Sequence, residues 1–118
     1  QLDDAIQQIK ALPEQQKDVN AYLEQIDKLL DNIYQDLDDD QKLELAAQLT
    51  YALSRCHENV SRVAIPYPNL LKIIGVAAKL RTNRHPAAQA SQSRALYILS
   101  LMPGAHDLEN GTYTPPEQ

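Results

Sequence analysis

Aliphatic side chains recur every three or four residues along two long stretches of this 118-residue chain. They are Val19, Leu23, Ile26, Leu30, Ile33 and Leu37 in the first stretch, and Ala46, Leu49, Leu53, Cys56, Val60 and Val63 in the second. A spacing of about 3.5 residues places each set on one face of an α-helix, whereas a half-buried strand would alternate every second residue. Because each apolar face needs a partner, the pattern predicts an all-α fold.

The limits of these two helices follow from proline and from acidic residues. Pro13 suits the first turn of the first helix, since its missing N–H would have no partner there. Asp38-Asp39-Asp40 then breaks that helix and supplies cap carboxylates to the next, which we expect from about Gln41 to Val63. Two helices of similar length with a short polar joint predict an antiparallel hairpin over residues 13–64.

Three shorter helices are predicted around this hairpin, over residues 2–11, 69–81 and 87–102. The middle one is mostly aliphatic and should be buried. Together they give a four- to five-helix bundle over residues 1–103. Residues 104–118 contain Asn-Gly, Pro-Pro and almost no aliphatic side chains, and we predict a flexible C-terminal tail that adds nothing to stability.

The composition supports helices packed on helices. The chain has no Phe and no Trp, so its core must consist of Leu, Ile, Val and Ala. Only three glycines are present, which leaves few positions for the tight turns that an all-β fold requires.

Charge is distributed very unevenly along the chain. Of the 16 acidic residues, 12 lie in positions 1–50 beside four lysines, so this half carries about −8. Seven basic residues and one acid occupy positions 55–94, which gives that segment about +6. Two interpretations remain open from the sequence: the basic segment binds an anionic partner, or the acidic half of the same fold neutralises it.

The candidate binding residues come from this basic segment. Lys79, Arg81 and Arg84 flank a predicted turn, and Arg94 follows about two helical turns later, so the four are expected at one end of the bundle. Arginine suits carboxylates and phosphates because its planar guanidinium donates two parallel hydrogen bonds. We therefore expect a protein partner with an acidic surface. The alternative is a nucleic-acid-associated regulator that uses the basic segment 72–94.

No pattern of catalytic or metal-binding residues is visible. Cys56 and His57 are adjacent, so on a helix their side chains point about 100° apart and do not form a nucleophile–base pair. The acids at positions 36, 38 and 40 imitate the start of a calcium loop, but Gln41 stands where that loop needs glycine. We therefore expect no catalytic residue, no metal and no cofactor.

The remaining sequence features concern the cellular compartment and the function of the protein. A single cysteine cannot form an internal disulfide, which favours a reducing compartment and a cytoplasmic protein. No stretch approaches the length of a membrane span, and membrane contact is not expected. The chain begins at Gln1 without a methionine, which leaves open a segment upstream. The function predicted from the sequence is that of a non-enzymatic interaction module, a small adaptor or regulatory protein that docks its partner on the bundle surface.

Overall fold

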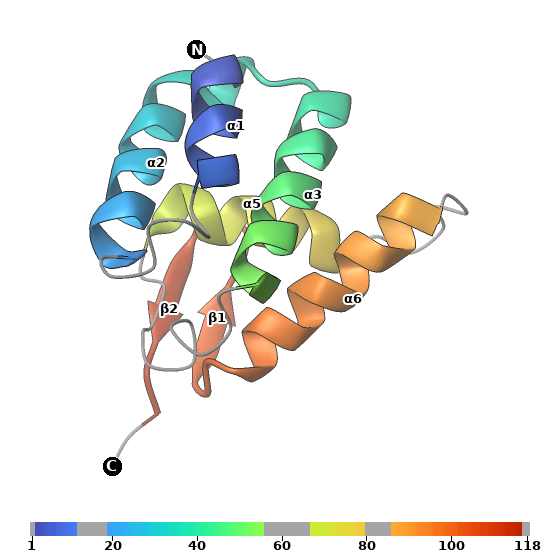
Figure 1. Ribbon diagram of the computed structural model, residues 1–118. Helices are drawn as coiled ribbons and strands as arrows, with labels where there is room; N and C mark the ends of the chain where they lie inside the picture. Colours follow the sequence, from blue (N-terminus) through green and yellow to red (C-terminus); the bar gives the residue numbers. More distant parts are fainter. Residues whose placement is uncertain (1, 12–18, 56–66, 80–85, 117–118) are drawn as a thin grey trace.

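The computed structural model of the chain describes residues 2–11, 19–55, 67–79 and 86–116. Its elements are α1 (Leu2–Ala11), α2 (Val19–Ile33), the 3₁₀ helix η2 (Tyr34–Asp36), α3 (Asp39–Arg55), α5 (Pro68–Ala78), α6 (Pro86–Ser100), β1 (Ala105–Asp107) and β2 (Thr112–Thr114) (Figure 1). The described part is therefore mostly helical, as the apolar spacing predicted, with one small sheet in addition. None of the helices within these ranges is long and apolar enough to cross a membrane.

The burial of side chains confirms the predicted phase of the two long helices. The buried apolar residues include Leu23, Ile26, Leu30, Ile33 and Leu37 around α2, and Leu45, Ala46, Leu49, Ala52 and Leu53 on α3. Tyr51, which the spacing leaves on the outer side of α3, is 47% exposed. The predicted start at Pro13 and the predicted continuation to Val63 lie outside the described residues.

Local hydrogen bonds define the joint between η2 and α3. The Oδ1 atom of Asp38 accepts the backbone N–H of Gln41 at 2.8 Å, and Oε1 of Gln41 accepts the backbone N–H of Asp38 at 3.0 Å. This reciprocal pair is a capping box, which satisfies two N–H groups that the helix itself leaves unpaired. Asp39 and Asp40 add negative charge to the first turn, where the helix dipole favours it. The prediction that the acidic run caps the second helix is confirmed, whereas α2 ends before that run, at Ile33, and η2 follows α2.

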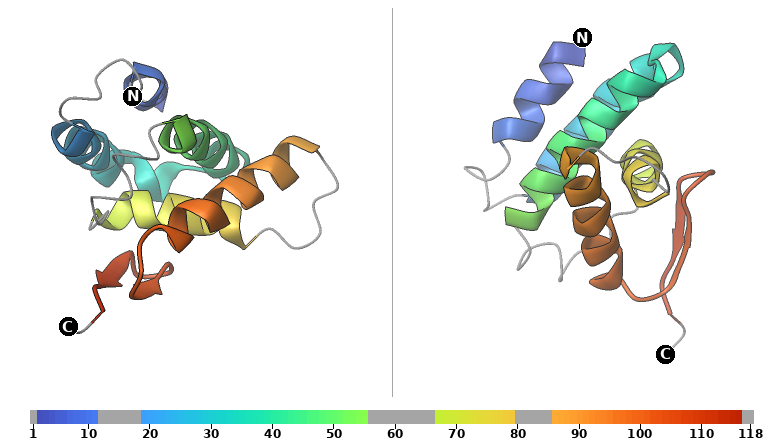
Figure 2. Two further views of the ribbon diagram at one scale, coloured as in Figure 1. Left: turned by 60° about the horizontal axis from the view of Figure 1, so that its bottom comes forward. Right: turned by 90° about the vertical axis from the view of Figure 1, so that its right-hand side faces the viewer.

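The helices lie in layers, which the left view of Figure 2 shows most clearly. α1 lies on one side of α2 and α3, whereas α5 and α6 lie on the other side. Although α2 and α3 run antiparallel in Figure 1, their main packing partners differ: α2 packs on α1 and α5, and α3 packs on α1, α5 and α6. The hairpin predicted over residues 13–64 is therefore not confirmed as a directly packed pair.

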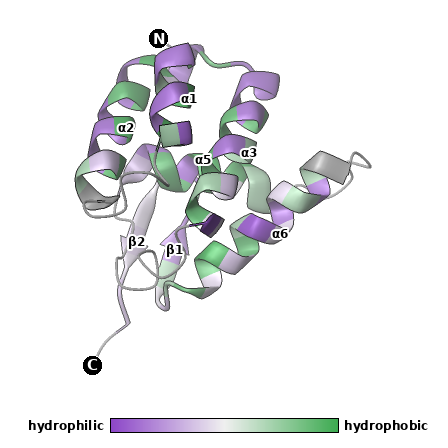
Figure 3. Ribbon diagram, in the orientation of Figure 1, coloured by the Kyte–Doolittle hydropathy of each residue, from purple (hydrophilic) through white to green (hydrophobic). Residues whose placement is uncertain are grey.

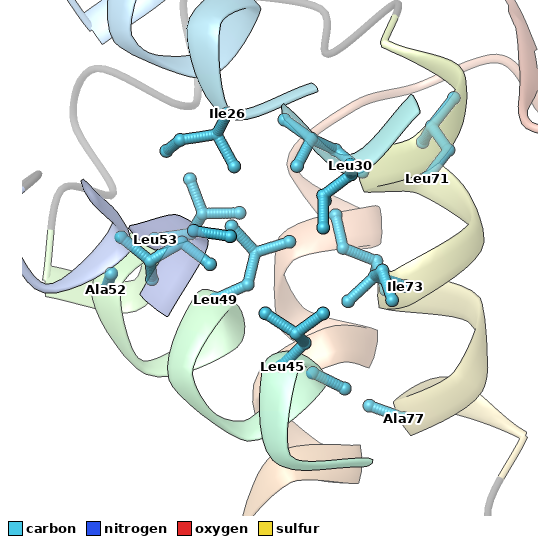
Figure 4. Close-up of a cluster of buried hydrophobic side chains, with 14 of the residues drawn as sticks. Ile26, Leu30, Leu45, Leu49, Ala52, Leu53, Leu71, Ile73 and Ala77 are labelled. Carbon is cyan, nitrogen blue, oxygen red and sulfur yellow. The ribbon is translucent and has the colours of Figure 1, made fainter. Parts of the chain in front are cut away.

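The core fills the space between α2, α3, α5 and α6. Leu45 and Leu49 of α3 point toward Ile73 and Ala77 of α5, with Leu30 of α2 beside them (Figure 4). Apart from Lys72, Val76 and Ala78, every residue of α5 after Pro68 is buried, in agreement with the predicted central helix. In Figure 3, hydrophobic and hydrophilic residues alternate along α2 and α3, as expected for helices with one buried face.

A carboxylate on α2 caps the start of α5. Pro68 occupies the first turn of α5, and Tyr67 before it makes no side-chain cap. Instead, Oδ1 of Asp27 accepts the backbone N–H groups of Asn69 at 2.9 Å and of Leu70 at 3.2 Å. The amide of Asn69 donates in return to the backbone oxygen of Asp27 at 3.2 Å and to Oδ1 of Asp31 at 3.3 Å. This polar cluster fixes the position of α5 relative to α2.

Residues 105–114 differ from the flexible tail predicted over 104–118. β1 and β2 pair antiparallel with His106 opposite Tyr113, and the N–H of Gly111 closes the turn on the oxygen of Asp107 at 2.8 Å. Leu108 in this turn packs against Gly75 of α5 so closely that a Cβ on Gly75 would stand 2.7 Å from the Cβ of Leu108. The prediction counted only the aliphatic residues of the segment, whereas a single leucine docks here because a glycine on α5 leaves room for it.

Candidate functional site

Of the four predicted basic residues, the structure describes Lys79 and Arg94, and these two have different contacts. Lys79, just after α5, forms an exposed ion pair with Glu109 of the β-turn, with 3.2 Å between Nζ and Oε1. Arg94 lies on α6, with its guanidinium carbon 5.2 Å from the centre of the Tyr51 ring on α3. Arg81 and Arg84 lie outside the described residues. Lys79 thus contacts a carboxylate, whereas Arg94 contacts an aromatic ring.

Tyr51 has two arginines near its ring. The guanidinium carbon of Arg55, four residues later on α3, is 5.7 Å from the centre of the same ring. A guanidinium over an aromatic face is attracted by the negative charge density of the ring, a contact that contributes about 0.5–1 kcal/mol at an exposed site. The two arginines come from different helices, so the packing of α3 on α6 positions them.

A second tyrosine extends this surface along α6. Tyr97 follows Arg94 by three residues, which places the two side chains next to each other on the helix, and it is 46% exposed. Leu96, which is 52% exposed, points to another side of α6 because adjacent residues on a helix lie about 100° apart. We define the α3–α6 surface as Tyr51, Arg55, Arg94 and Tyr97.

The α3–α6 surface is positively charged. α6 contains no acidic residue, and neither does the part of α3 that follows Glu44. Within the described ranges of the chain, neither Arg55 nor Arg94 forms an ion pair with a carboxylate. Both guanidinium groups lie near the Tyr51 ring, and the N–H groups of a guanidinium suit the carboxylate oxygens of a ligand.

Another tyrosine also contacts two cations, but in a less exposed setting. Lys42 of α3 and Lys72 of α5 place their Nζ atoms 4.9 Å and 5.3 Å from the centre of the Tyr34 ring. Burial raises the pKa of Tyr34 above its usual range. Because this ring is only partly exposed and joins η2 to α3 and α5, the contacts of Lys42 and Lys72 are those of a structural joint.

Side chains that could bind a metal or transfer a proton were located among the described residues. Among them, no group of three or more His, Cys, Asp or Glu side chains is arranged to hold a metal ion. His106 stacks on Tyr113 with 4.9 Å between ring centres, and burial lowers the pKa of its imidazole. Cys56 and His57, weighed above as a reactive pair, lie outside the described residues.

Comparison with known proteins adds no relative: no family model, no curated protein and no solved structure matches the chain. The function is therefore inferred from the chain's own residues.

The sequence analysis found one of the four residues of the α3–α6 surface. It selected Arg94 by charge, but it missed Arg55, Tyr51 and Tyr97. A signal was present, since Tyr51 and Arg55 are spaced i, i+4 and Arg94 and Tyr97 are spaced i, i+3, so each pair shares a helix face. Only the packing of α3 on α6 brings the two pairs together.

Proposed function

We propose that this domain is a non-enzymatic interaction module, a small adaptor or regulatory protein, that docks the acidic surface of a partner protein on its α3–α6 surface. The observation that carries the proposal is the position of Arg55 and Arg94 on either helix beside Tyr51, with no carboxylate paired to them in the described chain. The carboxylates of a partner would complete these contacts.

The geometry suits recognition because it reduces the cost of binding. An arginine whose guanidinium already contacts a ring has fewer conformations to lose when a carboxylate binds to it. Exposed tyrosines supply rigid contact area, and tyrosine and arginine are enriched among the residues that contribute most to protein interfaces. Tyr51 and Tyr97, each about half exposed, provide this area beside the two charges.

The alternative, a nucleic-acid-associated regulator, has one observation in its favour. Aromatic rings with nearby arginines also stack on the bases of single strands. However, one cation of the predicted basic segment 72–94 is already paired within the fold, because Lys79 forms an ion pair with Glu109. A net charge of −5 further disfavours a polyanion at long range. An acidic protein, whose charge is local, fits better.

The experiment is an NMR titration with a short peptide of alternating glutamate and serine. We expect the largest shift changes at the four residues of the α3–α6 surface. The double variant Arg55→Glu/Arg94→Glu should keep its helix content, because exposed charges contribute little to stability, and should bind about tenfold more weakly or worse. The matched control Lys10→Glu/Lys28→Glu changes the net charge equally on α1 and α2 and should bind like the parent chain.

Two results would contradict the proposal. Shift changes spread over other elements, or an equal loss of binding in the control variant, would show that the α3–α6 surface is not the docking site. A single-stranded oligonucleotide that binds this surface more tightly than the peptide, with an affinity that falls steeply as salt increases, would assign the surface to nucleic acid instead.

A further inference from the structure

The turn of the β1–β2 hairpin packs on α5 at two points where there is no room for an added side chain. Leu108 lies against Gly75, where a Cβ would stand 2.7 Å from the Cβ of Leu108. At the start of α5, a Cβ on Gly111 would overlap the backbone of Pro68. The right view of Figure 2 shows the two strands beside α5. Because close-packed atoms cannot interpenetrate, the backbone of the turn can shift appreciably only if the hairpin leaves α5.

The turn also contains the dipeptide Asn110-Gly111, whose two residues can react with each other. The backbone nitrogen of Gly111 loses its proton to hydroxide and forms a bond to Cγ of Asn110. The bond from Cγ to Nδ2 then breaks, and the leaving nitrogen takes a proton from water and departs as ammonia, which leaves a succinimide ring. A water molecule opens this ring at either carbonyl and gives aspartate or isoaspartate at position 110. Glycine favours ring closure because no Cβ hinders its nitrogen.

Asp107 holds both reacting groups in the folded chain. Its backbone oxygen accepts the N–H of Gly111 at 2.8 Å, and this is the nitrogen that must lose its proton and reach Cγ. Its carboxylate accepts Nδ2 of Asn110 at 2.8 Å and the backbone N–H of Asn110 at 3.1 Å. The side-chain amide of Asn110, and then its N–H, lower the pKa of Asp107, as expected for donors that favour the charged carboxylate. Attack on Cγ therefore requires these hydrogen bonds to break first.

Neither product fits the docked hairpin. Aspartate at position 110 replaces the donor Nδ2 with a carboxylate oxygen at hydrogen-bond distance from the carboxylate of Asp107, and two like charges this close repel each other. Isoaspartate carries the chain through its side-chain carbons, which adds one backbone carbon and lengthens the turn by about 1.5 Å. Gly111 lies too close to Pro68 to accommodate that length.

We propose that Asn110-Gly111 is a self-modification site that makes the β1–β2 hairpin an irreversible conformational switch. The docked hairpin prevents deamidation, and deamidation prevents the hairpin from docking again. The substrate is the side-chain amide of Asn110, and the co-reactant is water. Local opening of the hairpin sets the rate, because it releases both reacting groups from Asp107. The site does not include the α3–α6 surface and does not depend on the function proposed for that surface.

The first experiment measures the rate of deamidation in the full chain at neutral pH. Mass spectrometry follows the peptide that trypsin releases after Arg94, in which Asn110 is the only asparagine. A synthetic peptide of residues 105–116 gives the rate of the free sequence, because an isolated two-stranded hairpin is at best marginally stable in water. We expect the folded chain to react about tenfold more slowly than this peptide, or slower still.

A substitution on α5 tests the role of docking without changing the reacting segment. Gly75→Ala places a methyl group against Leu108 and should raise the deamidation rate of Asn110 about fivefold or more. The matched control is Gln7→Ala, an exposed position on α1, which should react at the parent rate. Circular dichroism shows whether each variant is folded. If Gly75→Ala does not fold, Leu108→Ala removes the same contact from the side of the hairpin.

Hydrogen exchange at the Gly111 amide tests whether the products can dock. Asn110→Asp has the charge of one product and should lose most of the protection of this amide, since its carboxylate repels that of Asp107. Asn110→Ala loses the hydrogen bond alone and should lose less protection. The isoaspartate form, separated from the incubated parent chain by chromatography, should exchange as fast as Asn110→Asp or faster.

Three outcomes would overturn the proposal. A folded parent chain that deamidates as fast as the free peptide would show that docking does not protect Asn110. A parent rate in the folded Gly75→Ala and Leu108→Ala variants would show that opening of the hairpin does not control the reaction. Full protection of the Gly111 amide in the Asn110→Asp variant and in the isoaspartate form would show that the products still dock.

Discussion

The carboxylate of Asp27 contributes to the docking of α5 in two ways, through the hydrogen bonds that it accepts and through its charge. Two substitutions distinguish these contributions. Asp27→Ala leaves the backbone N–H groups of Asn69 and Leu70 without their acceptor. Loss of an N-cap costs about 0.5–2 kcal/mol, and each N–H left unpaired in a partly buried place costs about 1–3 kcal/mol unless water reaches it. We therefore expect the free energy of unfolding to fall by about 1–3 kcal/mol.

Asp27→Asn keeps an oxygen in the same place and removes the charge. Partial burial raises the pKa of Asp27 above its ordinary value of 3.8, against the lowering effect of the Leu70 and Asn69 N–H groups, with Asp31 adding to the rise. The folded state therefore binds this proton more tightly than the unfolded chain. Stability from this group is fully present below pH 3.8 and is lost as the pH rises through the raised value. At neutral pH the asparagine variant should thus be at least as stable as the parent.

Urea titrations followed by circular dichroism, repeated between acid and neutral pH, measure both effects. The control is Glu24→Ala on the same helix, which removes only an exposed pair with Lys28 and should cost less than about 0.5 kcal/mol. If Asp27→Asn were as destabilising as Asp27→Ala at neutral pH, the charge and not the acceptor would hold α5. An Asp27→Ala variant as stable as the Glu24→Ala control would show that the cap contributes nothing.

Two further predictions concern the core and the β-hairpin. Leu53→Ala should lower the free energy of unfolding by about 2–4 kcal/mol, because its side chain is fully buried. Tyr51→Ala should cost much less in the same urea titration, since this ring is about half exposed, and comparable losses would contradict the helix phase. A chain ending at Gly104 should melt at a lower temperature than the full chain, because the cover that Leu108 provides over α5 is lost. Leu108→Ala in the full chain should reproduce most of this decrease in melting temperature. If the truncated chain melted at the same temperature as the full chain, the tail would contribute nothing to stability, as the sequence predicted.

Local patterns made the helices predictable. The apolar face formed by Leu23, Ile26 and Leu30 is visible in the spacing of residues within one segment. The cap formed by Asp38 and Gln41 also lies within four consecutive residues. The arrangement of the helices was not predictable in this way, because an apolar stripe fits any other stripe of similar length. Nothing in the residues of α1 indicates that it packs across both α2 and α3, which is why a directly packed hairpin was expected.

The β-hairpin had a signal that the sequence analysis interpreted as a feature of a flexible tail. Asn110-Gly111 is typical of tight hairpin turns, and Gly111 does adopt a positive φ of 71°. The flanking residues lack the apolar alternation that indicates a strand, since each strand has only three residues and one inward side chain, His106 or Tyr113. The segment is ordered by its contact with Gly75, which lies more than 30 positions earlier in the chain and cannot be inferred from local composition.

The charge separation read from the sequence left two interpretations, binding of a partner or neutralisation within the fold. The contacts of the described residues test the second interpretation, neutralisation within the fold. Glu24 pairs with Lys28 on the same helix, and Lys79 pairs with Glu109, so neither ion pair joins the acidic helices to an arginine. Arg55 and Arg94 contact a tyrosine instead. Within the described residues, the charge of these two arginines is therefore not paired with the carboxylates of α1 and α2, and the proposal of an acidic partner rests on this observation.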